Sequence, residues 1–331
     1  MPWHNQVRFK YDVQADKTTF MQRFIIRRIL YMFVALVAAT LFVFLLGRAQ
    51  GDPRNLLIQE GGYGVTQETW DLIGKQLHLD KPLVVQYLIW LGKVLSGDLG
   101  ESVGDRIPVA RQLSARIWPT VSLAAPAWIL AIIIGTPLGI LSSISRGSVA
   151  DYIARGFALV GQAAPQFWLA LMGILVFAVH LRWVPVATPG EGFAVRNYIL
   201  PVIVLGLGPT AAYLRLTRSA MLNVLDTEYI KLARAKGVGS GMVIWKHGFR
   251  NAVIPSLTLS TLVLAGLITG SIVIETVFAW PGIGRLAFEA VSNGDFPVVT
   301  GTVLFFTLFY LVLNFITDLM YVVIDPRIKL E

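Results

Sequence analysis

Charged residues are absent from six long stretches of the chain. A helix needs about 20 residues to cross the hydrocarbon core of a bilayer, within a range of about 17–25. Each stretch therefore predicts one membrane-spanning helix, and we expect an all-α membrane protein with six transmembrane helices. The stretches without Asp, Glu, Lys or Arg are Ile29–Gly47, Ile117–Ser145, Gly156–Leu181, Asn197–Leu214, Asn251–Ile274 and Phe296–Thr317.

Proline and glycine recur within these expected spans. Two pairs of glycines spaced four apart, Gly135 with Gly139 and Gly266 with Gly270, are typical of helices that approach closely in lipid. Any single proline or glycine can be explained as a kink that helps helices pack, but the number of these residues favours a packed bundle whose helices move. The prolines are Pro126, Pro137, Pro165, Pro201, Pro209 and Pro255.

Composition supports a membrane protein. Hydrophobic residues make up 55 % of the 331 residues and charged residues 15 %, whereas an ordinary soluble domain has about 25 % charged residues. The chain has no cysteine, which excludes disulfides and thiolate metal sites. The polar segment before the first span is too long for the start of a signal peptide, so we expect an uncleaved anchor.

Lysine and arginine are unevenly shared between the alternating connections. The set with both termini and the 218–250 loop is richer, and most basic residues of the other set lie in one long loop, which counts little in the positive-inside rule. We expect both termini in the cytoplasm and no role in binding nucleic acid, since this bias explains the net charge of +8. The expected divisions are a cytoplasmic segment 1–28, a first span 29–47, an extracytoplasmic subdomain 48–116, a five-helix core 117–324 and a cytoplasmic tail 325–331.

The 48–116 segment lies between the first two expected helices. Its centre, Pro82–Gly92, is apolar but too short to span a membrane. Two interpretations remain open: a small subdomain that caps the outer face, or one that docks a partner and shapes an entrance.

The chain offers no energy source of its own. It lacks the G-x-x-x-x-G-K-[ST] loop that binds nucleotide phosphates. It also lacks the paired mid-membrane carboxylates typical of ion-driven transport, because Glu275 and Asp318 lie at span margins, where snorkelling or capping is more common. The four histidines are scattered, so we expect neither a metal site nor catalysis, and energy must come from another subunit.

Uncharged polar side chains within the spans are the candidates for a transport pathway. They could equally form hydrogen bonds between helices, and both interpretations stay open. These residues are Gln162, Gln166, Thr136 and Ser260.

The 218–250 loop predicts a capped helical hairpin. Asp226 or Thr227 can cap a short helix, Glu228 suits its start, and Lys236 with Gly237 suits its end. Residues 229, 232, 233 and 236 share one face of this helix, and a second helix is expected from Met242 toward Pro255. From the residues alone, the hairpin either lies on the lipid surface or inserts into a groove of a soluble partner.

The run Glu-Tyr-x-x-x-Ala-Arg-Ala-Lys-Gly at 228–237 resembles the coupling motif of ABC importer permeases, whose general form is Glu-Ala-Ala, three residues, then Gly. Lys231 stands where the general motif has Glu, and Arg250 where it has a later Pro. Both departures match the permeases of dipeptide, oligopeptide and nickel systems, specifically their first-type subunit. The implied coupling residues are Glu228, Tyr229, Leu232, Ala233, Ala235, Lys236 and Gly237.

Further matches to that family extend over nearly the whole chain. One of them contains an expected extracytoplasmic turn formed by Trp280, Pro281, Gly282 and Gly284, with Trp280 anchored at the membrane interface. Contact of this turn with a substrate-delivering protein is implied by the resemblance alone. The matches are Gly51–Pro53, Ala164–Trp168, Glu275–Gly284, Asp295–Pro297 and Asp325–Arg327.

The resemblance implies a type I ABC importer permease bundle in the plasma (inner) membrane. It also implies a second homologous permease, two ATP-binding subunits that hold ATP and Mg, and an extracytoplasmic substrate-binding protein. The cargo would be peptides or a related small solute. An ion-coupled secondary transporter and a non-transporting membrane scaffold are the alternatives.

Overall fold

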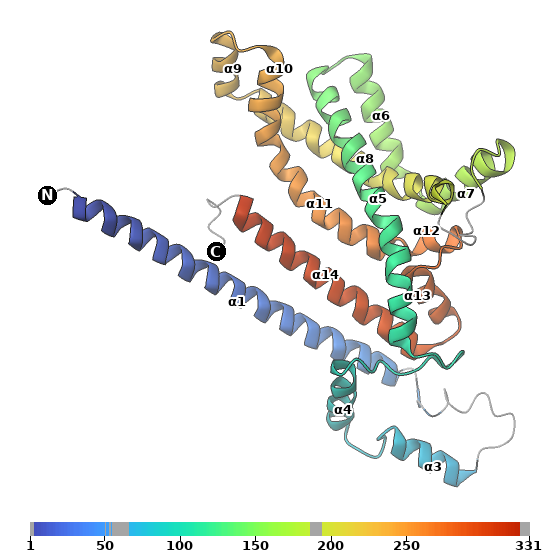
Figure 1. The fold of residues 1–331 in the computed structure, drawn as a ribbon. Helices are drawn as coiled ribbons and strands as arrows, with labels where there is room; N and C mark the ends of the chain where they lie inside the picture. Colours follow the sequence, from blue (N-terminus) through green and yellow to red (C-terminus); the bar gives the residue numbers. More distant parts are fainter. Residues whose placement is uncertain (1–2, 50, 53, 55–65, 186–193, 325–331) are drawn as a thin grey trace. The chain divides into compact units, whose positions relative to one another are not determined.

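The computed structural model describes residues 3–49, 51–52, 54, 66–185 and 194–324. Throughout these ranges every regular element is a helix, apart from one isolated bridge between Glu101 and Pro108 (Figure 1). The expected all-α class is confirmed. The expected tail 325–331, with its Asp325–Arg327 match, lies outside the described residues. The chain forms two compact units, which are Met1–Asp98 with Val303–Phe315 and Leu99–Thr302 with Ile316–Glu331.

The first unit is built on one long helix. Helix α1 covers Trp3–Ala49, so the expected first span is part of a longer helix whose apolar portion is Phe24–Ala49. Phe44 of α1 contacts the rings of Tyr87 and Trp90 on α4, which covers Leu83–Leu95. Helix α4 is apolar but too short to span, as the sequence predicts.

Arg54 organises the short segment that follows α1. Its guanidinium donates to both carboxylate oxygens of Asp52, at 2.6 Å for the shortest pair, and lies over the ring of Trp70. The Arg54 hydrogen bonds hold the pKa of the Asp52 carboxyl below its usual value. Trp70 belongs to α3, Gln67–Gln76, so this contact ties α3 to the residues after α1.

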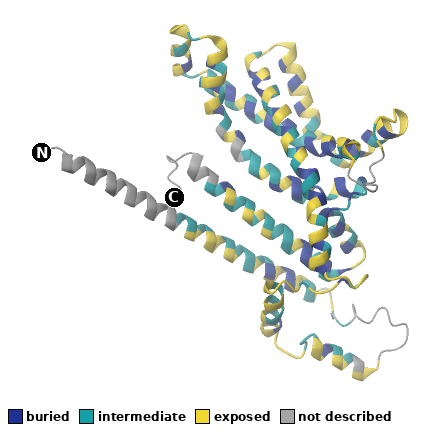
Figure 2. Ribbon diagram, in the orientation of Figure 1, coloured by how far each residue is buried: buried dark blue, intermediate teal, exposed yellow. Residues whose placement is uncertain are grey.

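The second unit contains the remaining helices together with the start and the end of α14. Helices α5 and α8 form its most extensive pair and carry much of the buried surface (Figure 2). A Cβ on Gly135 would lie 2.5 Å from the Thr210 carbonyl oxygen, and one on Gly139 would lie 2.7 Å from that of Leu214. These glycines therefore permit the close approach that their spacing predicts. The helices are α5 Val109–Ile144, α6 Val149–Ala163, α7 Gln166–Gly173, η1 Ile174–His180, α8 Val195–Leu225, α9 Glu228–Ala235, α10 Ser240–Met242, η2 Val243–Phe249, α11 Arg250–Gly270, α12 Ile272–Val277, α13 Ile283–Ser292 and α14 Phe296–Ile324.

Among the described residues, five helices are long and apolar enough to cross a membrane, and the number is six if one bent pair is counted as a single span. That pair, Val149–Ala163 with Gln166–His180, turns by 104° at the break before Gln166. Pro165 explains the break, because proline cannot donate a helical hydrogen bond and disfavours helical geometry in the residue before it. The third expected span is thus two helices, whereas α5, α8 and α11 continue through their prolines. Helix α5 also begins at Val109, before the expected boundary at 117.

Many large apolar side chains face outward. Examples in the second unit are Ile133, Leu159 and Val160, each exposed by more than half. In water such a surface would favour aggregation, but lipid tails are as apolar as these side chains. The exposed apolar faces therefore fit a chain surrounded by lipid.

Candidate functional site

Helix α9 begins and ends where the sequence predicts. Glu228 is its first residue, and Gly237 follows the last turn with φ +80. That backbone conformation favours glycine, and the Gly237 N–H donates to the Arg234 carbonyl oxygen. Thr227 occupies the cap position, but its hydroxyl donates to the Val224 carbonyl oxygen instead of capping α9.

One side of α9 holds the helix in place, and the other is free. Ile230 is fully buried, and the Tyr229 hydroxyl donates to the His247 carbonyl oxygen at 2.7 Å while accepting from the Asn251 amide at 2.9 Å. Tyr229 therefore ties α9 to η2 and α11, and Ala233 is half-buried. The free side, hereafter the α9 surface, consists of Leu232, Ala235, Lys236 and Gly237, with Glu228 exposed beside it in an ion pair with Lys231.

The second arm of the hairpin is a continuous helical path. Helices α10, η2 and α11 follow one another from Ser240 to Gly270, as expected from Met242 onward. The π-helical part, Val243–Phe249, places Gly248 against Met221 and Leu225 of α8. Helix α9 is thus connected through η2 to α8 and α11.

A buried ion pair joins α6 to the part of α8 that precedes this hairpin. Arg218 Nε donates to Asp151 Oδ1 at 2.8 Å and its Nη2 to Oδ2 at 3.0 Å. Asp151 is only 1 % exposed and also accepts from the Ser142 hydroxyl and the Gly147 N–H. This pair was not predicted from the sequence, because Ser148 followed by Asp151 indicates the start of α6 but not its partner 67 residues later.

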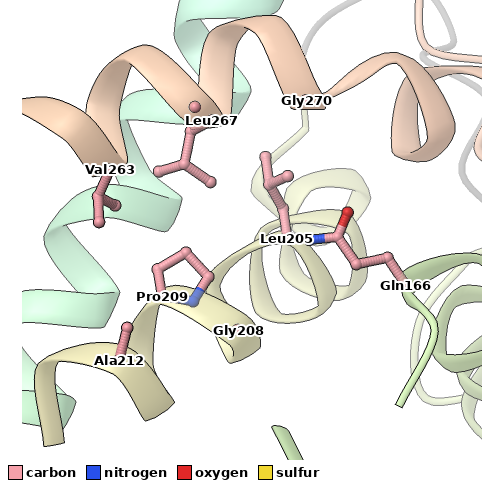
Figure 3. A pocket seen from close by; sticks show the side chains of 9 residues that line it. Gln166, Leu205, Gly208, Pro209, Ala212, Val263, Leu267 and Gly270 are labelled. Atoms are coloured by element: carbon pink, nitrogen blue, oxygen red, sulfur yellow. The ribbon is translucent and has the colours of Figure 1, made fainter. Parts of the chain in front are cut away.

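A cavity of about 260 Å³ opens between α7, α8 and α11. Gln166 supplies the one polar side chain among its lining residues, and Figure 3 shows that side chain extending from the start of α7 toward α8. A Cβ placed on Gly266 or Gly270 would have no atom of the described residues within 4 Å, so this second glycine pair does not bring two helices of the chain together as Gly135 and Gly139 do. The lining residues are Gln166, Leu205, Gly208, Pro209, Ala212, Val263, Gly266, Leu267 and Gly270.

The four candidate pathway residues lie in different surroundings. Gln166 lines the cavity, and Gln162 accepts a hydrogen bond from Arg215. Ser260 accepts from the Tyr213 hydroxyl at 2.7 Å, and its carbonyl oxygen accepts from Trp128, so it links α11 to α8 and α5. Thr136 is half-buried on α5 and is not among the cavity residues. Their role in a pathway stays a prediction.

Glu275 is completely buried, which differs from the snorkelling position expected at a span margin. Its Oε1 accepts from the hydroxyls of Thr120 and Ser271, both at 2.8 Å, and its Oε2 accepts from the Arg285 N–H at 2.9 Å. Thr120 Oγ1 in turn accepts from the Ile283 N–H. Glu275 thus does act as a cap, since it and Thr120 satisfy two free N–H groups at the start of α13.

The expected turn residues surround this carboxyl group. A Cβ on Gly282 would clash with the Glu275 carboxyl group, and one on Gly284 would lie 3.0 Å from Oε2. Trp280 is fully buried, donates to the Pro119 carbonyl oxygen and contacts the ring of Tyr198. Its expected place as an interfacial anchor is therefore wrong. Pro281 precedes Gly282 in the turn that leads into α13, as expected, whereas Gly284 is already part of α13 and not of the turn.

Nearly the whole chain matches two protein-family descriptions. Residues 135–330 match the family described as the inner membrane component of binding-protein-dependent transport systems, and residues 21–124 match the N-terminal membrane component of such systems. The chain belongs to this family. The match covers the α9 hairpin, the cavity and the Glu275 turn, and it confirms the resemblance to ABC importer permeases.

Three similar curated proteins show how far the likeness extends. A putative peptide permease protein of Brucella ovis is 40 % identical over 318 residues, and the dipeptide transport system permease protein DppB of Escherichia coli K12 is 37 % identical over 338 residues. The glutathione transport system permease protein GsiC of Escherichia coli K12 is 35 % identical over 310 residues. Each comparison covers 93 % of this permease and 99 % of the relative.

A solved structure shares the fold. An inward-facing structure of the MetNI methionine ABC transporter matches with a TM-score of 0.52 and 19 % identity, over 64 % of this permease and 96 % of that chain. The type I bundle expected from the sequence is thereby confirmed. This chain is a multi-pass membrane permease of an ABC importer, which works in a complex with permease and ATPase partners.

Proposed function

We propose that this permease translocates peptides or a related small solute together with a second homologous permease, two ATP-binding subunits and an extracytoplasmic substrate-binding protein. The observation that carries the proposal is the 37–40 % identity, along 93 % of the chain, to proteins named as peptide and dipeptide permeases. ATP and Mg would be bound by the ATPase subunits, and this chain would catalyse no reaction itself. Both termini and the α9 hairpin would be cytoplasmic.

The α9 surface is the proposed contact with an ATPase subunit. Closure of the ATPase dimer would push on α9, and Tyr229 and η2 would pass the movement to α8 and α11. The Asp151–Arg218 pair would carry α6 along with α8. Since α7, α8 and α11 line the cavity, their movement would change access to it. A change driven in this way requires that the ATPases contact the two states differently.

Copurification tests the proposed composition. The tagged permease, expressed in its native host and solubilised in mild detergent, should bring down a second permease and ATP-binding subunits that mass spectrometry identifies. Reconstituted with the binding protein, the complex should accumulate a labelled dipeptide in vesicles only when ATP is supplied. Recovery of the permease alone, or uptake driven by an ion gradient without ATP, would support the ion-coupled alternative.

Gly237→Val tests the coupling surface. Valine is strained at φ +80 and would add bulk at the end of α9, so we expect dipeptide uptake to fall at least about tenfold while the amount of protein in the membrane stays unchanged. Gly239→Val is the matched control, because Gly239 has φ −58 and equally open surroundings. Wild-type uptake by Gly237→Val would refute the coupling role.

A further inference from the structure

Helix α8 carries two arginines one turn apart that have very different partners. Arg218 is neutralised by Asp151, whereas Arg215 Nη1 donates to the neutral amide oxygen of Gln162 at 2.5 Å. Among the residues that the structure describes, no carboxylate forms an ion pair with Arg215. An exposed guanidinium with only a neutral partner remains able to bind an anion.

The Arg215 guanidinium reaches the last turn of α6, and both Arg215 and Gln162 are exposed. Asp151 is in the first turn of α6 and Gln162 in its last turn, about 16 Å apart at 1.5 Å per residue. The two arginines, about 4.5 Å apart along α8, therefore reach toward opposite ends of α6. An arginine that served only to meet lipid headgroups would extend toward the nearer end of its helix. Arg215 reaches instead toward the break in the bent span.

Arg215 lies one turn beyond the cavity-lining residues of α8, on the same face of that helix. Gly208, Ala212 and Arg215 share one face of α8 at spacings of four and three residues, and the first two line the cavity. Gln162 precedes the cavity residue Gln166 across the break. A Cβ on Gly161 would lie 3.2 Å from Ala211 Cβ, so glycine at 161 lets α6 and α8 approach closely at this level.

We propose that Arg215 and Gln162 form a binding site for the carboxylate of the transported peptide at the edge of this cavity. The inference rests on the proposed import of peptides. A guanidinium binds a carboxylate through two parallel hydrogen bonds. The Gln162 oxygen occupies one of the five N–H groups of Arg215, and the Gln162 NH₂ group can donate to a carboxylate oxygen. A carboxylate at position 162 would compete with the ligand for the Arg215 guanidinium. The neutral Gln162 side chain orients that guanidinium without such competition.

Charge substitutions separate ligand binding from a structural link between helices. In the complete importer reconstituted in vesicles, Arg215→Gln removes the charge and Gln162→Glu cancels it while strengthening the contact between α6 and α8. We expect both variants to lower initial alanyl-alanine uptake at subsaturating concentration by about tenfold or more, the size of a lost charge-assisted hydrogen bond. Arg215→Lys keeps the charge but loses the paired hydrogen bonds of the guanidinium, and Gln162→Ala removes one donor, so each should lower uptake, but less than Arg215→Gln and Gln162→Glu do.

Arg146→Gln is the matched control, because Arg146 is exposed in the turn between α5 and α6 and its loss removes one positive charge far along α6 from Gln162. It should transport as the wild type does. Complexes of all variants are compared at equal recovery of the partner subunits. Wild-type uptake by either Arg215→Gln or Gln162→Glu would overturn the site.

Lipid composition distinguishes a peptide carboxylate from a lipid phosphate. The difference between wild type and Arg215→Gln should be the same in vesicles with and without anionic phosphatidylglycerol. Its disappearance without anionic lipid would assign Arg215 to the lipid and overturn the proposal. Absence of alanyl-alanine uptake by the wild-type complex would instead refute the proposed function, and the carboxylate site with it.

Discussion

Glycines at three places in this permease serve three different purposes. Gly237 is required by its positive φ, at the end of α9. Gly282 has an ordinary φ of −94 but makes room for the buried Glu275 carboxyl group. Gly266 meets neither constraint and leaves space in the cavity lining. Substitution by alanine should therefore have unequal consequences, which depend on what each missing side chain would touch.

At the residue scale, Gly282→Ala should destabilise the permease. The new methyl group would displace Glu275 and break its bonds to Thr120 and Arg285, so overpacking adds to the loss of hydrogen bonds, together about 1–3 kcal/mol or more. A thermal unfolding scan in detergent should show a clear decrease in melting temperature. Gly266→Ala is the control and should unfold with the wild type. Equal melting temperatures for all three proteins would mean that the hydrogen bonds of the buried Glu275 carboxyl group contribute nothing to stability.

Two ion pairs of the second unit differ in burial and therefore in how much they stabilise their helices. Asp151–Arg218 joins α6 to α8, and its carboxylate is 1 % exposed. Glu228–Lys231 joins one turn of α9 to the next, with side chains 88 % and 61 % exposed. Exposed pairs within a helix contribute little because water screens them, whereas removal of one partner of a buried pair leaves the other charge uncompensated.

At the element scale, Asp151→Asn should loosen the packing of α6 on α8. The variant leaves Arg218 without its counter-charge and weakens the bonds to Ser142 and Gly147, a loss of about 1.5–3 kcal/mol for hydrogen bonds to a charged group. Faster proteolysis of the 145–148 turn and a lower melting temperature would report it. Glu228→Gln should change the melting temperature little. A similar effect of the two substitutions would contradict the importance of burial.

For the whole molecule, the absence of cysteine makes the proposed orientation directly measurable. Ser240 starts α10 beside α9, and Asn293 follows the last turn of α13; both are exposed. In right-side-out vesicles a membrane-impermeant maleimide should label Asn293→Cys at once and Ser240→Cys only after the vesicles are opened. Labelling in the reverse order would invert the orientation, and immediate labelling of both would contradict the number of spans between them.

Local features of this permease were predictable because adjacent residues encode them. Charge-free length sets where a helix can cross a membrane, so the spans followed from the sequence, although Pro165 divides the third into two helices. The limits of α9 followed from Glu228 and Gly237, whose effects act within one turn. The likeness of the 228–237 run to a coupling motif was equally a property of consecutive residues.

The tertiary structure alone decided which polar groups meet. Glu275 was expected at a span margin, but it is buried because Thr120, 155 residues earlier, comes within hydrogen-bonding distance. The buried Trp280 side chain donates a hydrogen bond to the Pro119 carbonyl oxygen. Arg215 donates to Gln162, 53 residues before it. Contacts of this kind depend on how whole helices pack, and no spacing along the chain specifies them. The sequence by itself determined the spans and the α9 hairpin, whereas the packing of α5, α6 and α8 decided where the charges lie.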